Sequence, residues 1–121
     1  PKVLLEINVA GEASKFGFKY ETLRSQMEEL LSLDRLAIDG LMAIPPFTPD
    51  PEKARPYFAR LREWRDALSQ EFRVPLPILS MGMSNDYPIA IEEGATMVRV
   101  GTALFGERKV KTWKPEGTAE D

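Results

Sequence analysis

The chain has 121 residues, of which 43% are hydrophobic and 29% charged, and its formal net charge is −3. This length and composition predict one ordinary globular domain with a modest core, and the negative charge argues against nucleic acid as a partner. The chain contains no cysteine and no histidine. Disulfides, thiolate metal sites and Ser-His-Asp, Cys-His or zinc-hydrolase chemistry are therefore excluded for these residues alone.

The first ten residues, PKVLLEINVA, lack the basic segment and the long apolar segment of a signal peptide. No apolar run approaches the roughly 18 to 20 residues that cross a bilayer. We therefore expect a cytoplasmic protein without a membrane partner. Because the chain opens with Pro1 rather than methionine, we also expect that a preceding segment is missing.

Four short apolar runs predict β-strands. The first is nearly continuous and rich in branched residues, which is typical of a strand covered on both faces. The second stops at a pair of prolines. The predicted strands are 3–9, 38–44, a third that residues 74–79 lead into and that ends near Ser80, and 97–100.

Two longer segments between these runs predict amphipathic helices, because apolar residues recur at helical spacing in 20–31 and 57–72. Asp50 before Pro51 resembles an N-cap followed by a first-turn proline. Pro56 requires the second helix either to begin there or to have a distorted first turn.

The remaining segments are shorter. Residues 87–93 suit a short helix closed by Gly94. Residues 11–17 and 80–86 are predicted loops. After Lys109 the chain becomes polar, and we expect residues 110–121 to form a poorly ordered tail.

Strands that alternate with helices predict the α/β class, with a parallel sheet and right-handed crossovers. Four such units are half of an eight-stranded TIM-type barrel. A half-barrel has two open edges, which must be paired. We therefore expect another copy, another chain or a missing N-terminal half to close the sheet.

Two predicted loops at the carboxyl ends of neighbouring strands could bind an anion. After the third strand, Gly82 lets a ligand approach the backbone, and Ser84 offers a hydroxyl near a helix start. After the fourth strand, Gly101 and Thr102 offer N–H groups and a second hydroxyl. Together they could bind a phosphate without a lysine. Alternatively, both are ordinary strand-to-helix turns, with Ser84 simply an N-cap.

Arg99 lies between Val98 and Val100 in the fourth apolar run. Its side chain points either into a barrel or outward, where it could extend to solvent or pair with a helix carboxylate. A buried guanidinium is costly unless it is paired. The functional interpretation is a permanent hydrogen-bond donor to a ligand, since arginine does not release its proton.

Other polar and sulfur-containing residues carry weaker predictions. Asn8 lies late in the predicted first strand and Lys15 in the loop after it, where Lys15 could contact an anion but better fits a solvated charge. We expect the methionines near strand ends, Met42, Met81 and Met83, to fill the core rather than contact a cofactor. The charged residues Arg62, Glu63 and Asp66 are assigned to a solvated helix face.

Three motifs, INVAGEASKFGF, GLMAIPP and LSMGMSNDYPIAIEEGATMVRVGTALFGER, together resemble the pyridoxal phosphate homeostasis (YggS/PROSC-like) family. The resemblance spans Val3 to about Arg108. It implies an alanine racemase N-terminal-like barrel, of which residues 1–109 are the C-terminal half. It also implies that this barrel binds pyridoxal 5′-phosphate (PLP) at its strand ends, as a homeostasis factor or carrier without established catalysis.

The resemblance also implies roles for single residues. Ser84, with the backbone around Gly82 and Met83, would hold phosphate oxygens, and Gly101 and Thr102 would hold the others. Arg99 would face the pyridine nitrogen, keep it unprotonated and weaken the cofactor as an electron sink. The Schiff-base lysine is expected in the missing N-terminal half, because no lysine of this chain matches its context.

Two alternatives stay open beside a non-catalytic PLP carrier. One is an amino-acid racemase-like PLP enzyme, which needs a second acid-base group opposite the lysine. No such candidate is evident in the sequence. The other is a non-catalytic half-barrel module whose open edges pair with a partner.

Overall fold

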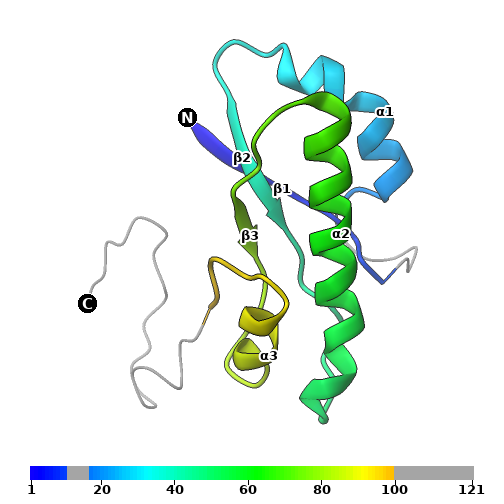
Figure 1. Cartoon of the computed structure of the whole chain (residues 1–121), viewed down its shortest axis with the longest axis vertical. Coiled ribbons are helices and arrows are strands. Elements are labelled where there is room, and N and C mark those ends of the chain that lie inside the picture. Colours follow the sequence, from blue (N-terminus) through cyan, green and yellow to red (C-terminus); the bar gives the residue numbers. More distant parts are fainter. Residues whose placement is uncertain (11–16, 100–121) are drawn as a thin grey trace.

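The computed structural model describes residues 1–10 and 17–99. Over these ranges the chain forms a parallel α/β arrangement with three strands, β1 (Lys2–Glu6), β2 (Ala37–Met42) and β3 (Ile78–Ser80). Helix α1 (Tyr20–Leu31) connects β1 to β2. The 3₁₀ helix η1 (Pro51–Ala54) and helix α2 (Arg55–Phe72) connect β2 to β3, and helix α3 (Tyr87–Glu92) follows β3 (Figure 1).

The sheet has the order β1-β2-β3 with every pairing parallel, as the alternation of strands and helices predicted. Leu5, Leu41 and Leu79 lie in one register row, and all three belong to or pack against the core. In the adjacent row, Leu4 and Ile78 are only partly buried and lie outside that core. Because side chains alternate along a strand, these two rows point to opposite faces of the sheet.

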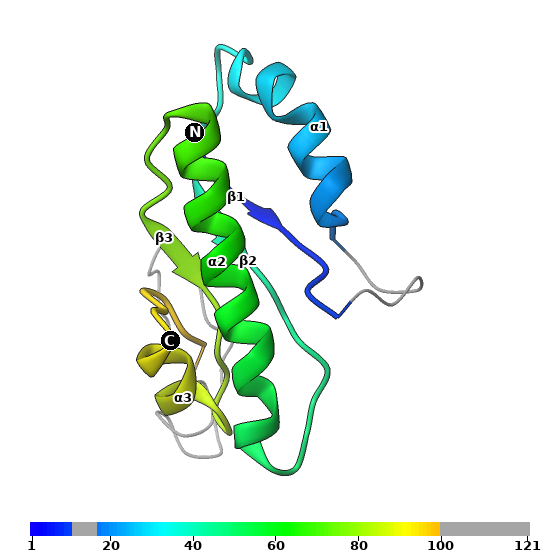
Figure 2. The same cartoon turned by 45° about the vertical axis from the view of Figure 1, so that its right-hand side comes forward.

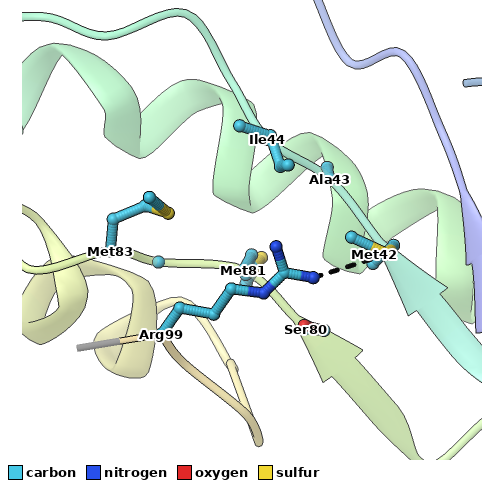
Figure 3. A pocket seen from close by; sticks show the side chains of 8 residues that line it. Met42, Ala43, Ile44, Ser80, Met81, Met83 and Arg99 are labelled. Atoms are coloured by element: carbon cyan, nitrogen blue, oxygen red, sulfur yellow. Dashed lines mark hydrogen bonds between the residues drawn. The ribbon is translucent and has the colours of Figure 1, made fainter. Parts of the chain in front are cut away.

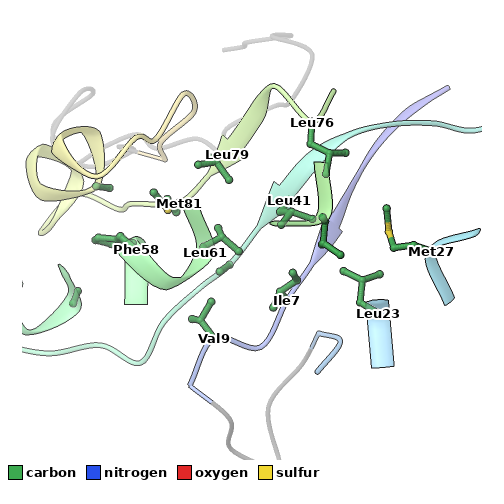
Figure 4. Close-up of a cluster of buried hydrophobic side chains, with 14 residues drawn as sticks. Ile7, Val9, Leu23, Met27, Leu41, Phe58, Leu61, Leu76, Leu79 and Met81 are labelled. Atoms are coloured by element: carbon green, nitrogen blue, oxygen red, sulfur yellow. The ribbon is translucent and has the colours of Figure 1, made fainter. Parts of the chain in front are cut away.

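The core lies between the sheet and the helices α1 and α2, which run across the same side of the strands (Figure 2). The helices contribute the predicted apolar stripes, including Leu23 and Met27 from α1 and Phe58 and Leu61 from α2 (Figure 4). Leu68 of α2 is buried as well. The complete buried apolar set is Ile7, Val9, Leu23, Met27, Leu41, Ala43, Ala54, Phe58, Leu61, Leu68, Leu76, Leu79, Met81 and Ala90.

Local signals set the helix ends where the sequence predicted them. The Asp50 side chain accepts a hydrogen bond from the Glu52 N–H at 3.0 Å and caps η1. Pro56 occupies the first turn of α2, where its missing N–H would have had no helical partner. Gly94, with φ of +108°, follows Glu93, the C-cap residue of α3, as expected of a left-handed helix stop.

The strands are shorter than predicted. β1 ends at Glu6, because Asn8 N–H donates to the Phe18 carbonyl at 2.8 Å and the chain turns toward residue 18. β2 ends at Met42, ahead of an exposed Ile44.

The predicted fourth strand is wrong over its described part, residues 97–99, which keep one isolated bridge, between Ser80 and Met97. Regular pairing stops there because β3 has only three residues and the chain bends at Gly82, with φ of +107°.

No helix within residues 1–10 and 17–99 is long and apolar enough to span a membrane. Residues 110–121 lie outside the described ranges.

Candidate functional site at the strand ends

A pocket lies at the carboxyl ends of β2 and β3 (Figure 3). Its empty space is about 190 Å³ and includes open solvent. The lining residues are Met42, Ala43, Ile44, Ser80, Met81, Gly82, Met83 and Arg99.

Arg99 points into this pocket and not toward α1 or α2. Its Nη2 lies 4.0 Å from the Met42 sulfur, so the guanidinium extends over the ends of β2 and β3 (Figure 3). Its backbone N–H donates to the Gly82 carbonyl at 2.9 Å. Within the described residues no carboxylate pairs with this half-buried side chain. The expected alternative, an outward arginine paired with a helix carboxylate, is therefore wrong.

The segment that follows β3 and the segment that leads up to Arg99 lie side by side. Met81 N–H donates to the Met97 carbonyl at 3.0 Å, and the N–H groups of Thr96 and Met97 donate to the Leu79 carbonyl. Residues 96–99 therefore lie beside residues 79–82, and the predicted adjacency of the two loops stays a prediction. The other half of the proposed phosphate site, Gly101 and Thr102, falls outside the described residues.

The loop after β3 is folded by Asp86, a residue that the sequence analysis did not single out. Its Oδ1 accepts a hydrogen bond from the Met83 N–H at 2.7 Å, while the Asp86 and Tyr87 N–H groups donate to the Met83 carbonyl. Asp86 is buried and is the N-cap residue of α3, so Ser84 is not that cap. An Asp two residues before Pro88 is a helix-start signal that could have identified it.

These hydrogen bonds determine which N–H and hydroxyl groups of the loop after β3 can donate to a ligand. The Met83 N–H already donates to Asp86, and the role of the backbone around Met83 in holding an anion stays a prediction. In the described part of the chain, the N–H groups of Gly82 and Ser84 and the exposed Ser84 hydroxyl make no hydrogen bond. Gly82 lines the pocket, and Ser84 lies two residues further along the same loop. This loop therefore offers two N–H groups and one hydroxyl to an anion.

The remaining predicted residues have mixed outcomes. Met81 is buried in the core as expected, and all three methionines line the pocket, with Met83 42% exposed. Asn8 is buried, and its side chain accepts a hydrogen bond from the Ala10 N–H at 3.1 Å. Lys15 lies outside the described residues.

Arg62 is not part of a solvated face. Its Nη1 lies 2.7 Å from Glu93 Oε1, and Glu93 also pairs with Arg55 at 2.8 Å. Hydrogen bonds from Arg55 and Arg62 hold the pKa of Glu93 below its ordinary value. Glu63 and Asp66 are exposed, as predicted. Among residues 1–10 and 17–99, no cluster of three acidic, histidine or cysteine side chains could hold a metal ion.

Comparison with known proteins shows the family of this chain. The family model of the alanine racemase N-terminal domain matches residues 1–109. The pyridoxal phosphate homeostasis protein of Aquifex aeolicus is 56% identical over 107 residues, which are 88% of this chain and 47% of that protein. The corresponding protein of Pseudomonas aeruginosa is 49% identical over 88% of this chain and 44% of its own length.

Solved structures extend the similarity to three dimensions. PipY of Synechococcus elongatus PCC7942, solved without PLP, matches with a TM-score of 0.80 and 38% identity over 88% of this chain and 50% of PipY. PipY with PLP bound matches with a TM-score of 0.77 and 37% identity.

This chain spans about half the length of the curated relatives that it matches. Its parallel strands and helices are a partial TIM-barrel-like fold, as predicted. Its placement as the C-terminal half stays a prediction. The chain belongs to the alanine racemase N-terminal domain family, among the pyridoxal phosphate homeostasis proteins.

Proposed function

We propose that the intact protein binds PLP in the cytoplasm and acts in its homeostasis as a carrier, not as a catalyst. The observation that carries this proposal is the pocket at the ends of β2 and β3, which is lined both by Arg99 and by a loop with unused hydrogen-bond donors. The PLP-bound structure of PipY supports the choice of ligand.

The chemistry of the donors fits a phosphate. The N–H groups of Gly82 and Ser84 and the Ser84 hydroxyl supply three donors, and hydrogen bonds to a charged acceptor are stronger than those to a neutral one. Thr102 and the N–H of Gly101 would complete the set from the neighbouring segment. No lysine is needed at this position, so the phosphate role does not depend on the Schiff-base lysine expected elsewhere in the protein.

Arg99 would meet the pyridine nitrogen of the cofactor. Bound PLP supplies an electron sink for reactions at an amino-acid carbon, and the sink is strongest when the ring nitrogen is protonated. Because an arginine keeps its proton, it donates to that nitrogen and leaves it unprotonated. A weakened electron sink suits carriage of PLP better than turnover.

The racemase-like alternative has a specific basis in the family model, whose description is the alanine racemase N-terminal domain. A racemase needs two acid-base groups on opposite sides of the substrate carbon. Among the residues that line the described pocket, Arg99 is the one ionisable side chain. Turnover of chiral alanine by the purified intact protein would favour the racemase over the carrier.

The rest of the barrel is part of the same proposal. The missing N-terminal half would supply the lysine and pair with the open edge of β1, or a second copy would pair with that edge. The partly buried Leu4 and Ile78 support a covering layer on their face of the sheet. A folded, stable monomer of the 121-residue chain alone would argue that neither partner is obligatory.

Titration of the intact protein with PLP tests the proposal, with the visible absorbance of the bound cofactor as the readout. We expect Ser84→Ala combined with Thr102→Val to weaken PLP binding by about 1–3 kcal/mol, because the phosphate loses two hydroxyl partners. Arg99→Ala should mainly shift the absorbance. Ser25→Ala is a matched control, since its exposed hydroxyl bonds only within α1. Unchanged affinity in the double variant would refute the phosphate assignment.

A further inference from the structure

Four charged side chains join α3 to α2, and we call them the α2–α3 clamp: Arg55, Arg62, Glu92 and Glu93. Arg55 contacts Glu92 and Glu93, each at 2.8 Å, and Arg62 contacts Glu93 at 2.7 Å. Arg62 Nη1 also donates to the Glu93 backbone carbonyl at 3.0 Å. Both carboxylate oxygens of Glu93 are thus held by arginines that lie seven residues apart on α2.

The clamp matters for the position of α3 because this helix is short and buries few side chains, with Ile89 packed against the core. α3 has six residues, and Ala90 is its one fully buried side chain. A helix this short is not stable by itself and depends on tertiary contacts. α2, in contrast, has 18 residues and is anchored in the core by Phe58, Leu61 and Leu68. Glu93 is only 16% exposed, so its two ion pairs are partly shielded from water and salt.

α3 in turn supports the loop that carries the proposed phosphate donors. The Tyr87 N–H donates to the Met83 carbonyl at 2.9 Å, at the junction of loop and helix. Gly82 packs directly on α3, since a Cβ built on Gly82 would lie 2.8 Å from the Ala90 Cβ and 3.4 Å from the Tyr87 Cα. A displacement of α3 would therefore move Gly82 and Ser84 together.

We propose that the α2–α3 clamp positions the phosphate donors of Gly82 and Ser84, so that it sets the preference of the protein for the phosphorylated cofactor over its unphosphorylated form. This inference rests on the proposed function, because it assumes that the loop binds the phosphate of PLP. The clamp residues touch no ligand in this scheme. They act through α3 as positioning residues.

The test compares binding of PLP with binding of pyridoxal, which lacks the phosphate, by the intact protein and its variants. Glu93→Gln should weaken PLP binding about 2- to 30-fold, the range expected for mutations that act through connecting contacts, and should leave pyridoxal binding unchanged. Arg62→Met should have the same selective effect. If Glu93→Gln does not fold, Glu92→Gln takes its place in the test, because it removes the more exposed ion pair of the clamp, Arg55–Glu92.

Glu71→Gln is the matched control. It breaks an ion pair of similar length, Arg24–Glu71 at 2.7 Å, which joins α1 to the other end of α2. It should change binding of neither ligand. An equal loss for PLP and pyridoxal in the clamp variants, or no loss at all, would overturn the inference while leaving PLP binding by the unmodified protein intact. Failure of the unmodified protein to bind PLP would instead refute the proposed function, and the inference with it.

Discussion

Gly82 occupies the most constrained position of the candidate site, and Gly82→Ala gives the sharpest test of its geometry. The backbone at Gly82 has φ of +107°, which side-chain-bearing residues rarely adopt. A methyl group there would also lie 2.8 Å from the Ala90 Cβ and 3.2 Å from the Val98 Cγ1. The substitution therefore combines backbone strain with a collision between the loop and α3.

The two effects can be estimated separately. A non-glycine residue in a sparsely populated backbone region costs about 1–3 kcal/mol. Inserting a methyl group into a packed contact costs about another 1–3 kcal/mol. We therefore expect Gly82→Ala to lower the free energy of unfolding by about 2–6 kcal/mol, a large part of the roughly 5–15 kcal/mol typical of a whole domain.

Gly94 provides a matched comparison, because its φ of +108° is nearly the same. A Cβ at Gly94 would lie 3.3 Å from Cδ of the flexible Arg62 side chain and 3.8 Å, an ordinary contact distance, from the Leu79 Cδ1. Gly94→Ala should therefore lower the free energy of unfolding through backbone strain alone, by about 1–3 kcal/mol. Urea denaturation of the intact protein measures both values as free energies of unfolding.

A double variant separates the collision from the strain. Ala90→Gly alone should cost about 1 kcal/mol through helix propensity, yet it removes the atom that the new methyl group would strike. The loss in Gly82→Ala/Ala90→Gly should therefore be smaller than the sum of the two single losses by about 0.5–3 kcal/mol. Equal losses for Gly82→Ala and Gly94→Ala, together with strict additivity, would refute the packing of the loop on α3.

Two further predictions concern the core and the clamp. Phe58→Ala removes a side chain that is 1% exposed and should lower the free energy of unfolding by about 3–5 kcal/mol in the same denaturation assay; a loss below about 1 kcal/mol would contradict its place in the core. Hydrogen bonds from Arg55 and Arg62 lower the pKa of Glu93 from its ordinary 4.5, so below that pH the unfolded state binds more protons than the folded state. The stabilisation of the fold by the ionised Glu93 is therefore complete above about pH 4.5 and is lost as the pH falls through the lowered pKa of Glu93. Stability measured against pH should fall less steeply on the acid side in Glu93→Gln, and identical profiles would argue against the ion pairs.

Features encoded in neighbouring residues could be predicted from the sequence. The apolar spacing of α1 and α2 produced the buried stripes that include Met27 and Leu61. Asp50 and Gly94 marked a helix start and a helix stop through their own side-chain and backbone chemistry. The loop containing Gly82 and Ser84 could be selected because both residues follow a predicted parallel strand, where ligands bind in this class of fold.

Other features could not be predicted, because they depend on residues far apart in the chain. The pairing of Arg62 with Glu93 spans 31 residues, and on α2 alone Arg62 has the spacing of a solvated charge. The end of regular pairing near Met97 depends on the length of β3, since a strand can extend only as far as its partner.

The amino-acid sequence by itself determined the alternation of strands and helices, the apolar faces and the loop after β3 with its unused hydrogen-bond donors, because each depends on contacts within a few residues. Only the tertiary structure decided that Arg99 points into the pocket, that Asp86 occupies the Met83 N–H, and that Glu93 ties α3 to α2. The physical reason is that the direction of a side chain, and the partner that satisfies a buried donor or charge, depend on which elements the fold brings together.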